Sequence, residues 1–102
     1  FGQLFESLVV HELRALTGRT VYHARLNTTL EVDAVANVGG RDVLVEVKLG
    51  YTPEVIDHAA DTLKRFAAQV EDEPALIVVT SGGPAHRRKD GVAVIPIGAL
   101  GP

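Results

Sequence analysis

The 102-residue chain has no cysteine, which excludes a disulfide framework and any metal site built on thiolates. Its purely apolar runs are short, such as residues 75–79, whereas a helix that crosses a bilayer needs about 20 apolar residues. Cations are not in excess either: the formal net charge is −3, so the composition gives no general attraction to nucleic acid. We therefore expect a single domain over residues 1–102, cytoplasmic and without a membrane segment.

Three common enzyme motifs are also missing. The four histidines lack the spacing of a zinc site, and neither serine lies in a Gly-x-Ser-x-Gly sequence. The chain has no Gly-rich segment that ends in Lys-Ser or Lys-Thr, so an ATP-binding part would lie outside it. Because the chain starts at Phe1, inside a predicted helix and without Met, we expect a fragment with further sequence upstream.

Hydrophobic periodicity predicts the element order α-β-β-β-α-β-β. Apolar residues follow a helical period over 3–17, and Gly18 stands where a C-terminal glycine is expected. Thr52, Pro53 and Glu54 have the features of a helix start. We expect an α/β fold with a mixed sheet, in which the apolar strand is parallel and buried and Pro96 puts the last strand at an edge. The predicted strands are 20–26, 30–38, 41–49, 75–80 and 92–97, and residues 81–91 are predicted to form a loop.

The Gly39-Gly40 pair is typical of a two-residue hairpin turn between the second and third strands. If these are the two turn residues, position 38 pairs with 41, and counting back along the ladder puts Asp33 opposite Glu46. Side chains alternate between the two faces of a strand. One face then carries Val32, Ala34, Ala36, Val43, Val45 and Val47, and the other carries Glu31, Asp33, Glu46 and Lys48.

A solvated outer face is one explanation for the four charges, since antiparallel sheets often have one. Two features argue against it. Directly opposed Asp33 and Glu46 repel each other, and Glu46-Val47-Lys48 interrupts an apolar strand that is expected to be central. Two adjacent carboxylates suit Mg²⁺ or Mn²⁺ and leave coordination positions for phosphate oxygens. Lys48, on the same side, can position an attacking water and offset charge on the phosphate.

Asp33, a twelve-residue gap and Glu46-Val47-Lys48 resemble the signature of the PD-(D/E)XK nucleases, which include type II restriction enzymes and Holliday-junction resolvases. The resemblance implies a restriction-endonuclease-like α-β-β-β-α-β core with an extra C-terminal edge strand. It also implies Mg²⁺- or Mn²⁺-dependent hydrolysis of DNA, with Asp33, Glu46 and Lys48 as catalytic residues. Asp33 and Glu46 would bind the metal together with Glu6, which corresponds to a glutamate in the first helix of many members. Val32 stands where the motif's name has Pro, a position that varies widely in these nucleases.

Residues 2–13, 31–33, 46–48 and 92–100 are similar to a domain of unknown function found at the C-terminus of many prokaryotic AAA-type ATPases. This implies a C-terminal fragment of a longer ATPase chain, with the upstream ATPase domain as a partner. Whether the domain forms a homodimer is left open. The alternative function is a non-catalytic nucleic-acid-binding or regulatory module appended to such an ATPase. The net negative charge of the chain favours the non-catalytic module, whereas the intact motif favours the enzyme.

The basic stretch Arg87-Arg88-Lys89 is the candidate contact with DNA phosphates. A solvated loop is the other interpretation of these three residues, and the sequence favours it. The acidic net charge does not exclude a nuclease, because cations bound at carboxylates reverse the local sign of the charge.

Overall fold

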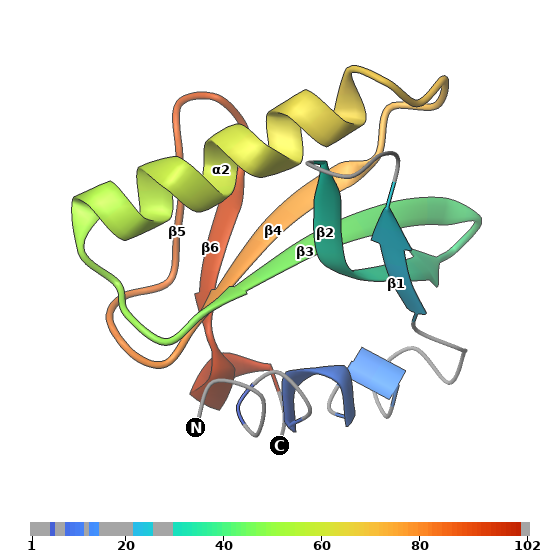
Figure 1. The fold of residues 1–102 in the computed structure, drawn as a ribbon. Helices are drawn as coiled ribbons and strands as arrows, with labels where there is room; N and C mark the ends of the chain where they lie inside the picture. The colour runs from blue at the N-terminus through green and yellow to red at the C-terminus, as the bar shows by residue number, and fades with distance from the viewer. Residues whose placement is uncertain (1–4, 6–7, 12, 15–21, 26–29, 101–102) are drawn as a thin grey trace.

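The computed structural model describes residues 5, 8–11, 13–14, 22–25 and 30–100. These residues form one mixed β-sheet of six strands in the order β1-β2-β3-β4-β6-β5 (Figure 1). The predicted mixed α/β class is therefore confirmed. The elements are β1 (Tyr22–Arg25), β2 (Glu31–Val38), β3 (Arg41–Lys48), α2 (Pro53–Ala67), β4 (Ala75–Thr80), β5 (His86–Arg87), β6 (Ala93–Pro96) and the 3₁₀ helix η1 (Ile97–Ala99).

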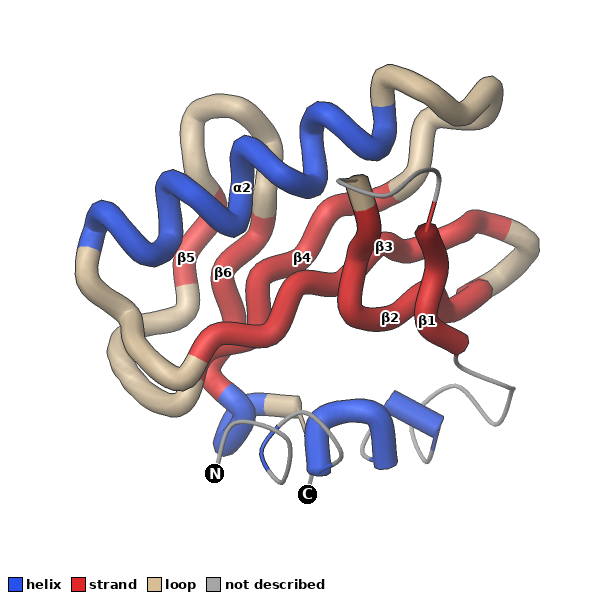
Figure 2. The backbone as a smooth tube through the Cα atoms, in the orientation of Figure 1, coloured by secondary structure: helices blue, strands red, loops and turns tan. Residues whose placement is uncertain are grey.

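Helical segments cover both faces of the sheet (Figure 1 and Figure 2). Helix α2 crosses one face, while η1 and the described helical residues near the N-terminus lie against the other. Each face therefore has its own core. The α2-side core is Leu30, Val32, Val35, Leu44, Ile56, Ala59, Ala60, Leu63, Phe66, Val78, Val92 and Val94, and the opposite core is Val9, Leu13, Ala34, Ala36, Val43, Val45 and Val79.

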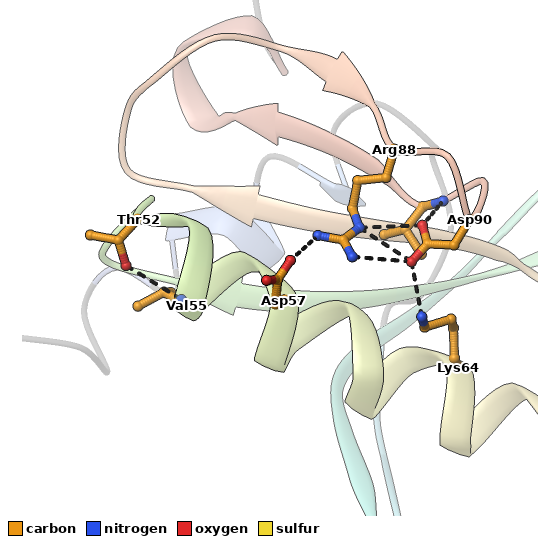
Figure 3. A network of polar contacts seen from close by, with 7 residues as sticks. Thr52, Val55, Asp57, Lys64, Arg88 and Asp90 are labelled. Carbon is orange, nitrogen blue, oxygen red and sulfur yellow. Dashed lines mark hydrogen bonds and ion pairs between the residues drawn. The ribbon is translucent and has the colours of Figure 1, made fainter.

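Helix α2 begins where the sequence predicts. Thr52 is the N-cap, and its Oγ1 accepts a hydrogen bond from the N–H of Val55 at 3.3 Å (Figure 3). Pro53 occupies the first turn. One stripe of the helix is buried against the sheet and includes Leu63 and Phe66. Within the described residues, no helix has the length and apolar character needed to span a membrane.

The hairpin between β2 and β3 has the predicted register. Gly39 and Gly40 form the turn with φ of 60° and 84°, conformations that glycine adopts without steric cost. Val38 pairs with Arg41, and the ladder continues in this register as far as Ala34 and Val45. The turn therefore places the acidic ends of β2 and β3 next to each other, as the sequence predicts.

Beyond Ala34, strand β2 departs from regular alternation. Between Tyr22↔Val35 and Ala24↔Val32, two steps along β1 correspond to three along β2, so β2 contains an extra residue, as in a β-bulge. As a result, Val32 lies in the α2-side core with Val35, and the expectation that it shares a face with Ala34 is wrong. The sequence shows no bulge signal, because neither glycine nor proline occurs in β2.

The C-terminal strands confirm one prediction and correct another. Strand β4 is parallel to β3, as expected, and its last three residues are buried. Strand β6, however, is not a simple edge strand, because β5 pairs with it at His86↔Val94 and Arg87↔Ala93. The segment predicted as a loop thus contains a two-residue strand, which is too short to leave a periodic signal. Only the Pro96 end of β6 extends beyond this pairing.

Substituting Gly40 with alanine should destabilise the domain by roughly 1–2 kcal/mol, because a left-handed backbone costs an L-residue about this much. Gly39→Asn is the matched control, since its φ of 60° is one that asparagine tolerates. Denaturant unfolding of both variants measures the difference. Equal destabilisation by the two substitutions would contradict the assigned turn.

Candidate functional site

Asp33 and Glu46 lie where the backbone ladder between β2 and β3 ends. The N–H of Asp33 donates to Oε1 of Glu46 at 3.1 Å, and the N–H of Val47 donates to Oδ2 of Asp33 at 2.8 Å. Each carboxylate therefore accepts a hydrogen bond from the main chain of the opposite strand, in place of a ladder carbonyl. The predicted proximity of the two acids is confirmed, and side chains take over the connection between the strands at this point.

Glu46 is almost completely enclosed, with 7% of its surface exposed. It pairs with the fully buried Val78 of β4, and Leu44, two residues earlier on the same face, packs in the α2-side core. Asp33 is half-buried. A buried carboxylate is costly unless it is hydrogen-bonded or paired, so this position in a central strand needs a compensating partner.

Burial raises the pKa of Glu46, the negative charge of Asp33 raises it further, and the net value is about 8. Lys48 acts in the opposite direction, since its Nζ lies 4.0 Å from Oε2 of Glu46, and the N–H of Asp33 also favours the charged form. These two favourable contacts do not offset burial and like-charge repulsion. At neutral pH the Glu46 carboxyl therefore mainly keeps its proton, unless positive charge comes close.

One oxygen of each acid accepts a backbone N–H, and a hydrogen bond between the two side chains also raises the pKa of Glu46. Oδ1 of Asp33 and Oε2 of Glu46 accept no main-chain hydrogen bond from the described residues, so a cation that displaces the proton between the two acids can coordinate them. No group of three or more His, Asp or Glu side chains forms a metal site within the described ranges. Glu6, the third metal ligand of the prediction, lies outside the described residues.

The carboxylate of Glu31 pairs with a residue of β1. It was predicted to lie opposite Lys48, but its Oε2 lies 2.8 Å from Nη2 of Arg25 on β1. The bulge in β2 ends the simple register before Glu31 is reached. The local acid pair is therefore Asp33 and Glu46, with Lys48 as the nearby cation.

In the basic stretch, Arg88 has a structural partner on each side (Figure 3). Its Nη1 lies 2.6 Å from Oδ1 of Asp57 on α2, and its Nη2 lies 3.2 Å from Oδ2 of Asp90. Lys64 of α2 also contacts Asp90, at 2.9 Å. Although burial alone would raise it, hydrogen bonds from Arg88, Lys64 and the N–H of Val92 hold the pKa of Asp90 well below its usual range. This network, the Arg88 clamp, ties the turn before β6 to α2.

The Arg88 clamp leaves Arg87 and Lys89 as the exposed cations of the predicted DNA contact. Arg87 Nη1 donates to the carbonyl of Gly91 at 3.1 Å, and Lys89 is exposed to solvent. Strand β5 is three strands away from β3, which corresponds to roughly 14–15 Å at the usual strand spacing. These two cations are therefore separate from the carboxylate pair.

A further feature escaped the sequence analysis: a cleft of about 260 Å³ beside the ends of β3 and β4, here called the Tyr51 cleft. The available signal was Ser81-Gly82-Gly83-Pro84 directly after a buried strand, which reads as an ordinary turn. Residues that line the cleft include Tyr51, Ile56, Gly82, Gly83, His86 and Val94.

The fold and the site together define a mixed α/β domain in which two acids and a lysine meet at the end of a β-hairpin. The family model described as "Domain of unknown function (DUF4143)" matches residues 1–100. The chain belongs to this family, which is typically found with AAA ATPases. No curated protein and no solved structure gives a significant match. The narrower resemblance is thus confirmed, and membership of the PD-(D/E)XK nucleases stays a prediction.

Glu46→Gln should remove a pH dependence of stability that wild type shows between about pH 4.5 and 8. Because the folded pKa is raised, the unfolded chain loses its proton first, so wild-type stability falls as pH rises through this window. At pH 9, without divalent metal, the variant should be more stable by roughly 1–4 kcal/mol, and at pH 4 nearly equal. Gln keeps the oxygen that accepts the N–H of Asp33.

Asp42→Asn is the matched control for this prediction, since it removes an exposed acid from the same strand. Urea unfolding at several pH values measures all three proteins. Asp42→Asn should keep the wild-type slope. If Glu46→Gln keeps it as well, the carboxyl is not in the environment described.

Arg88→Ala should destabilise the domain by about 1–2 kcal/mol, because Asp90 and Asp57 lose a shared cation that is partly exposed to solvent. Lys64 remains with Asp90, which limits the loss. Lys89→Ala, one residue later in the same turn, should stay within about 0.5 kcal/mol of wild type. Thermal unfolding distinguishes the two, and a similar loss in both variants would argue against the Arg88 clamp.

Proposed function

We propose that this domain is a metal-dependent nuclease that hydrolyses phosphodiester bonds of DNA. The observation that supports the proposal is the convergence of Asp33, Glu46 and Lys48 at the end of the β2–β3 hairpin, where each acid accepts a backbone N–H from the opposite strand. A hairpin built only for stability has no need of two opposed acids in a central position.

The residues present fit Mg²⁺ or Mn²⁺. Oδ1 of Asp33 and Oε2 of Glu46 can coordinate an ion that displaces the proton between the two acids, and these ions are commonly bound through one or two carboxylates plus water and substrate phosphate. The raised pKa of Glu46 also supports a metal site, because it shows that the ionised carboxylate has too little positive charge around it. When bound, the ion supplies Lewis-acid activation of the phosphodiester and lowers the pKa of a water.

The backbone contacts keep the two acids in place before any ligand arrives. Oε1 of Glu46 and Oδ2 of Asp33 are each fixed by an N–H of the opposite strand, so the remaining oxygens have restricted directions. Such preorganisation lowers the cost of assembling a charged site at the moment of reaction. Asp33, being half-buried, is the more accessible of the two ligands.

Lys48 has the role of holding the attacking water and stabilising charge on the phosphate. Its Nζ lies 4.0 Å from Oε2 of Glu46, and about a third of its side chain is exposed, so the ammonium faces both the acid pair and solvent. A substrate phosphate that approaches the carboxylates thus comes within reach of a positive charge. The Lys48 stem is anchored at the last residue of β3.

A non-catalytic module attached to an ATPase is the second candidate, and two observations favour it. Glu46 has little exposed surface, and Arg88 of the basic stretch is already bound by two carboxylates. The family's association with AAA ATPases is compatible with either function, and we propose an ATPase domain as the partner in both cases.

Mg²⁺ or Mn²⁺ at ten times its Kd should stabilise wild type by about 1.4 kcal/mol through linkage. For a domain of this size this corresponds to a rise in Tm of roughly 5–10 °C. Glu46→Gln should lose most of the rise because it removes a charged ligand, whereas Asp42→Asn should retain it. Thermal melts with and without chelator measure the effect.

Lys48→Ala should separate binding from chemistry. It should keep the metal-dependent rise in Tm, since it removes no ligand, while cleavage of single- and double-stranded DNA drops below detection. If metal leaves the wild-type Tm unchanged and no form of DNA is cut, the non-catalytic module replaces the nuclease as the function of this domain.

A further inference from the structure

The Tyr51 cleft lies at the edge of the sheet where ligands of α/β folds commonly bind, outside the carboxyl ends of parallel strands. Lys48 and Thr80 are the last pair between β3 and β4, and the cleft residues Tyr51 and Gly82 follow them by three and two positions. The cleft is on the α2 side, because it is also lined by residues of the α2-side core. Glu46 and Lys48 lie on this same face of β3.

The Tyr51 ring is held in place against two glycines. A Cβ at Gly83 would come within 2.8 Å of the ring and would displace it, and one at Gly82 would come within 3.1 Å and would crowd it. The Oγ1 of Thr80 donates to the carbonyl of Gly82 at 2.8 Å and so shapes the loop. Despite this support Tyr51 remains 54% exposed. The result is an aromatic ring that lies over two glycines and is open to solvent.

The walls of the cleft favour an uncharged, flat group. The two full charges among them cancel, since Asp57 and Arg88 form an ion pair at 2.6 Å. Ile56 and Val94 supply apolar surface. The volume of about 260 Å³ is below the roughly 300–1,000 Å³ of pockets for drug-sized ligands, so it suits a single ring system.

We propose that the Tyr51 cleft binds one base of a single-stranded nucleic acid by stacking on the Tyr51 ring. The choice of ligand rests on the proposed function, because Lys48 is the phosphate contact of that function and is three residues from Tyr51. Three residues span at most about 11 Å, so a strand with a phosphate at Lys48 reaches the cleft within a few nucleotides. Stacking on aromatic side chains is the usual way in which proteins hold single strands without regard to sequence.

Binding of a labelled oligothymidylate, measured by fluorescence anisotropy in the presence of EDTA, tests the proposal without any catalysis. Tyr51→Ala should raise the Kd roughly 5- to 150-fold, which is the range expected for the loss of one stacked base. Tyr51→Phe keeps the ring and should bind within about twofold of wild type. Leu49→Ala, which truncates another exposed apolar residue of the same segment, is the matched control and should leave the Kd unchanged.

An abasic strand of the same length carries the same phosphates and should bind Tyr51→Ala and wild type equally. The chain has two tyrosines and no tryptophan, so in a Tyr22→Phe background Tyr51 is the only strong emitter. Its fluorescence should change saturably with the thymidylate strand and not with the abasic one. This readout needs no change at Tyr51 and holds even if Tyr51→Ala fails to fold.

The proposal is overturned if Tyr51→Ala binds the thymidylate strand as wild type does, or if the abasic strand changes Tyr51 emission equally. Its failure is distinguishable from failure of the nuclease proposal. Stacking is measured without metal and should survive in Glu46→Gln, whereas cleavage should not. Retained base binding without any cleavage would leave the Tyr51 cleft in place and remove the nuclease.

Discussion

The structure depends on how two acids are accommodated between the ends of β2 and β3. Asp33 and Glu46 face each other in a central part of the sheet, where burial and like charge both oppose ionisation. Each acid accepts an N–H from the other strand, so the hydrogen bonds of the ladder are replaced and not lost. The pair thus keeps β2 joined to β3, while one oxygen of each carboxyl group stays outside these main-chain hydrogen bonds.

The rest of the molecule supports this arrangement from both faces. Helix α2 covers the face that carries Glu46, and the described N-terminal helical residues pack on the other (Figure 1). The Arg88 clamp connects α2 to the turn before β6 and so links the helix to the parallel part of the sheet. The carboxyl ends of the parallel strands β3 and β4 bring Lys48 and the Tyr51 cleft to the same edge of the sheet. The proposed catalytic site and the proposed base-binding site are therefore neighbours.

Local rules explain what could be predicted. The Gly39-Gly40 turn specified the register, since a two-residue turn leaves one pairing, and the period of two then brought Asp33 to Glu46. The bulge in β2 and the pairing of Glu31 with Arg25 were missed because both depend on β1, a neighbour that the turn does not specify. The pairing of Arg88 with Asp57 was missed for a similar reason, because Asp57 is 31 residues away in the chain.

By itself, the sequence determined the mixed α/β class, the hairpin register and the identity of the acid pair, because each follows from periodicity and turn geometry over a few residues. Only the tertiary structure decided how deeply Glu46 is buried, what holds Arg88 and where Tyr51 lies. Burial and charge balance are sums over neighbours that come from distant parts of the chain, such as β4 and α2. A local sequence pattern predicts which residues come together, and the packing of elements from distant parts of the chain determines their burial and their electrostatic environment.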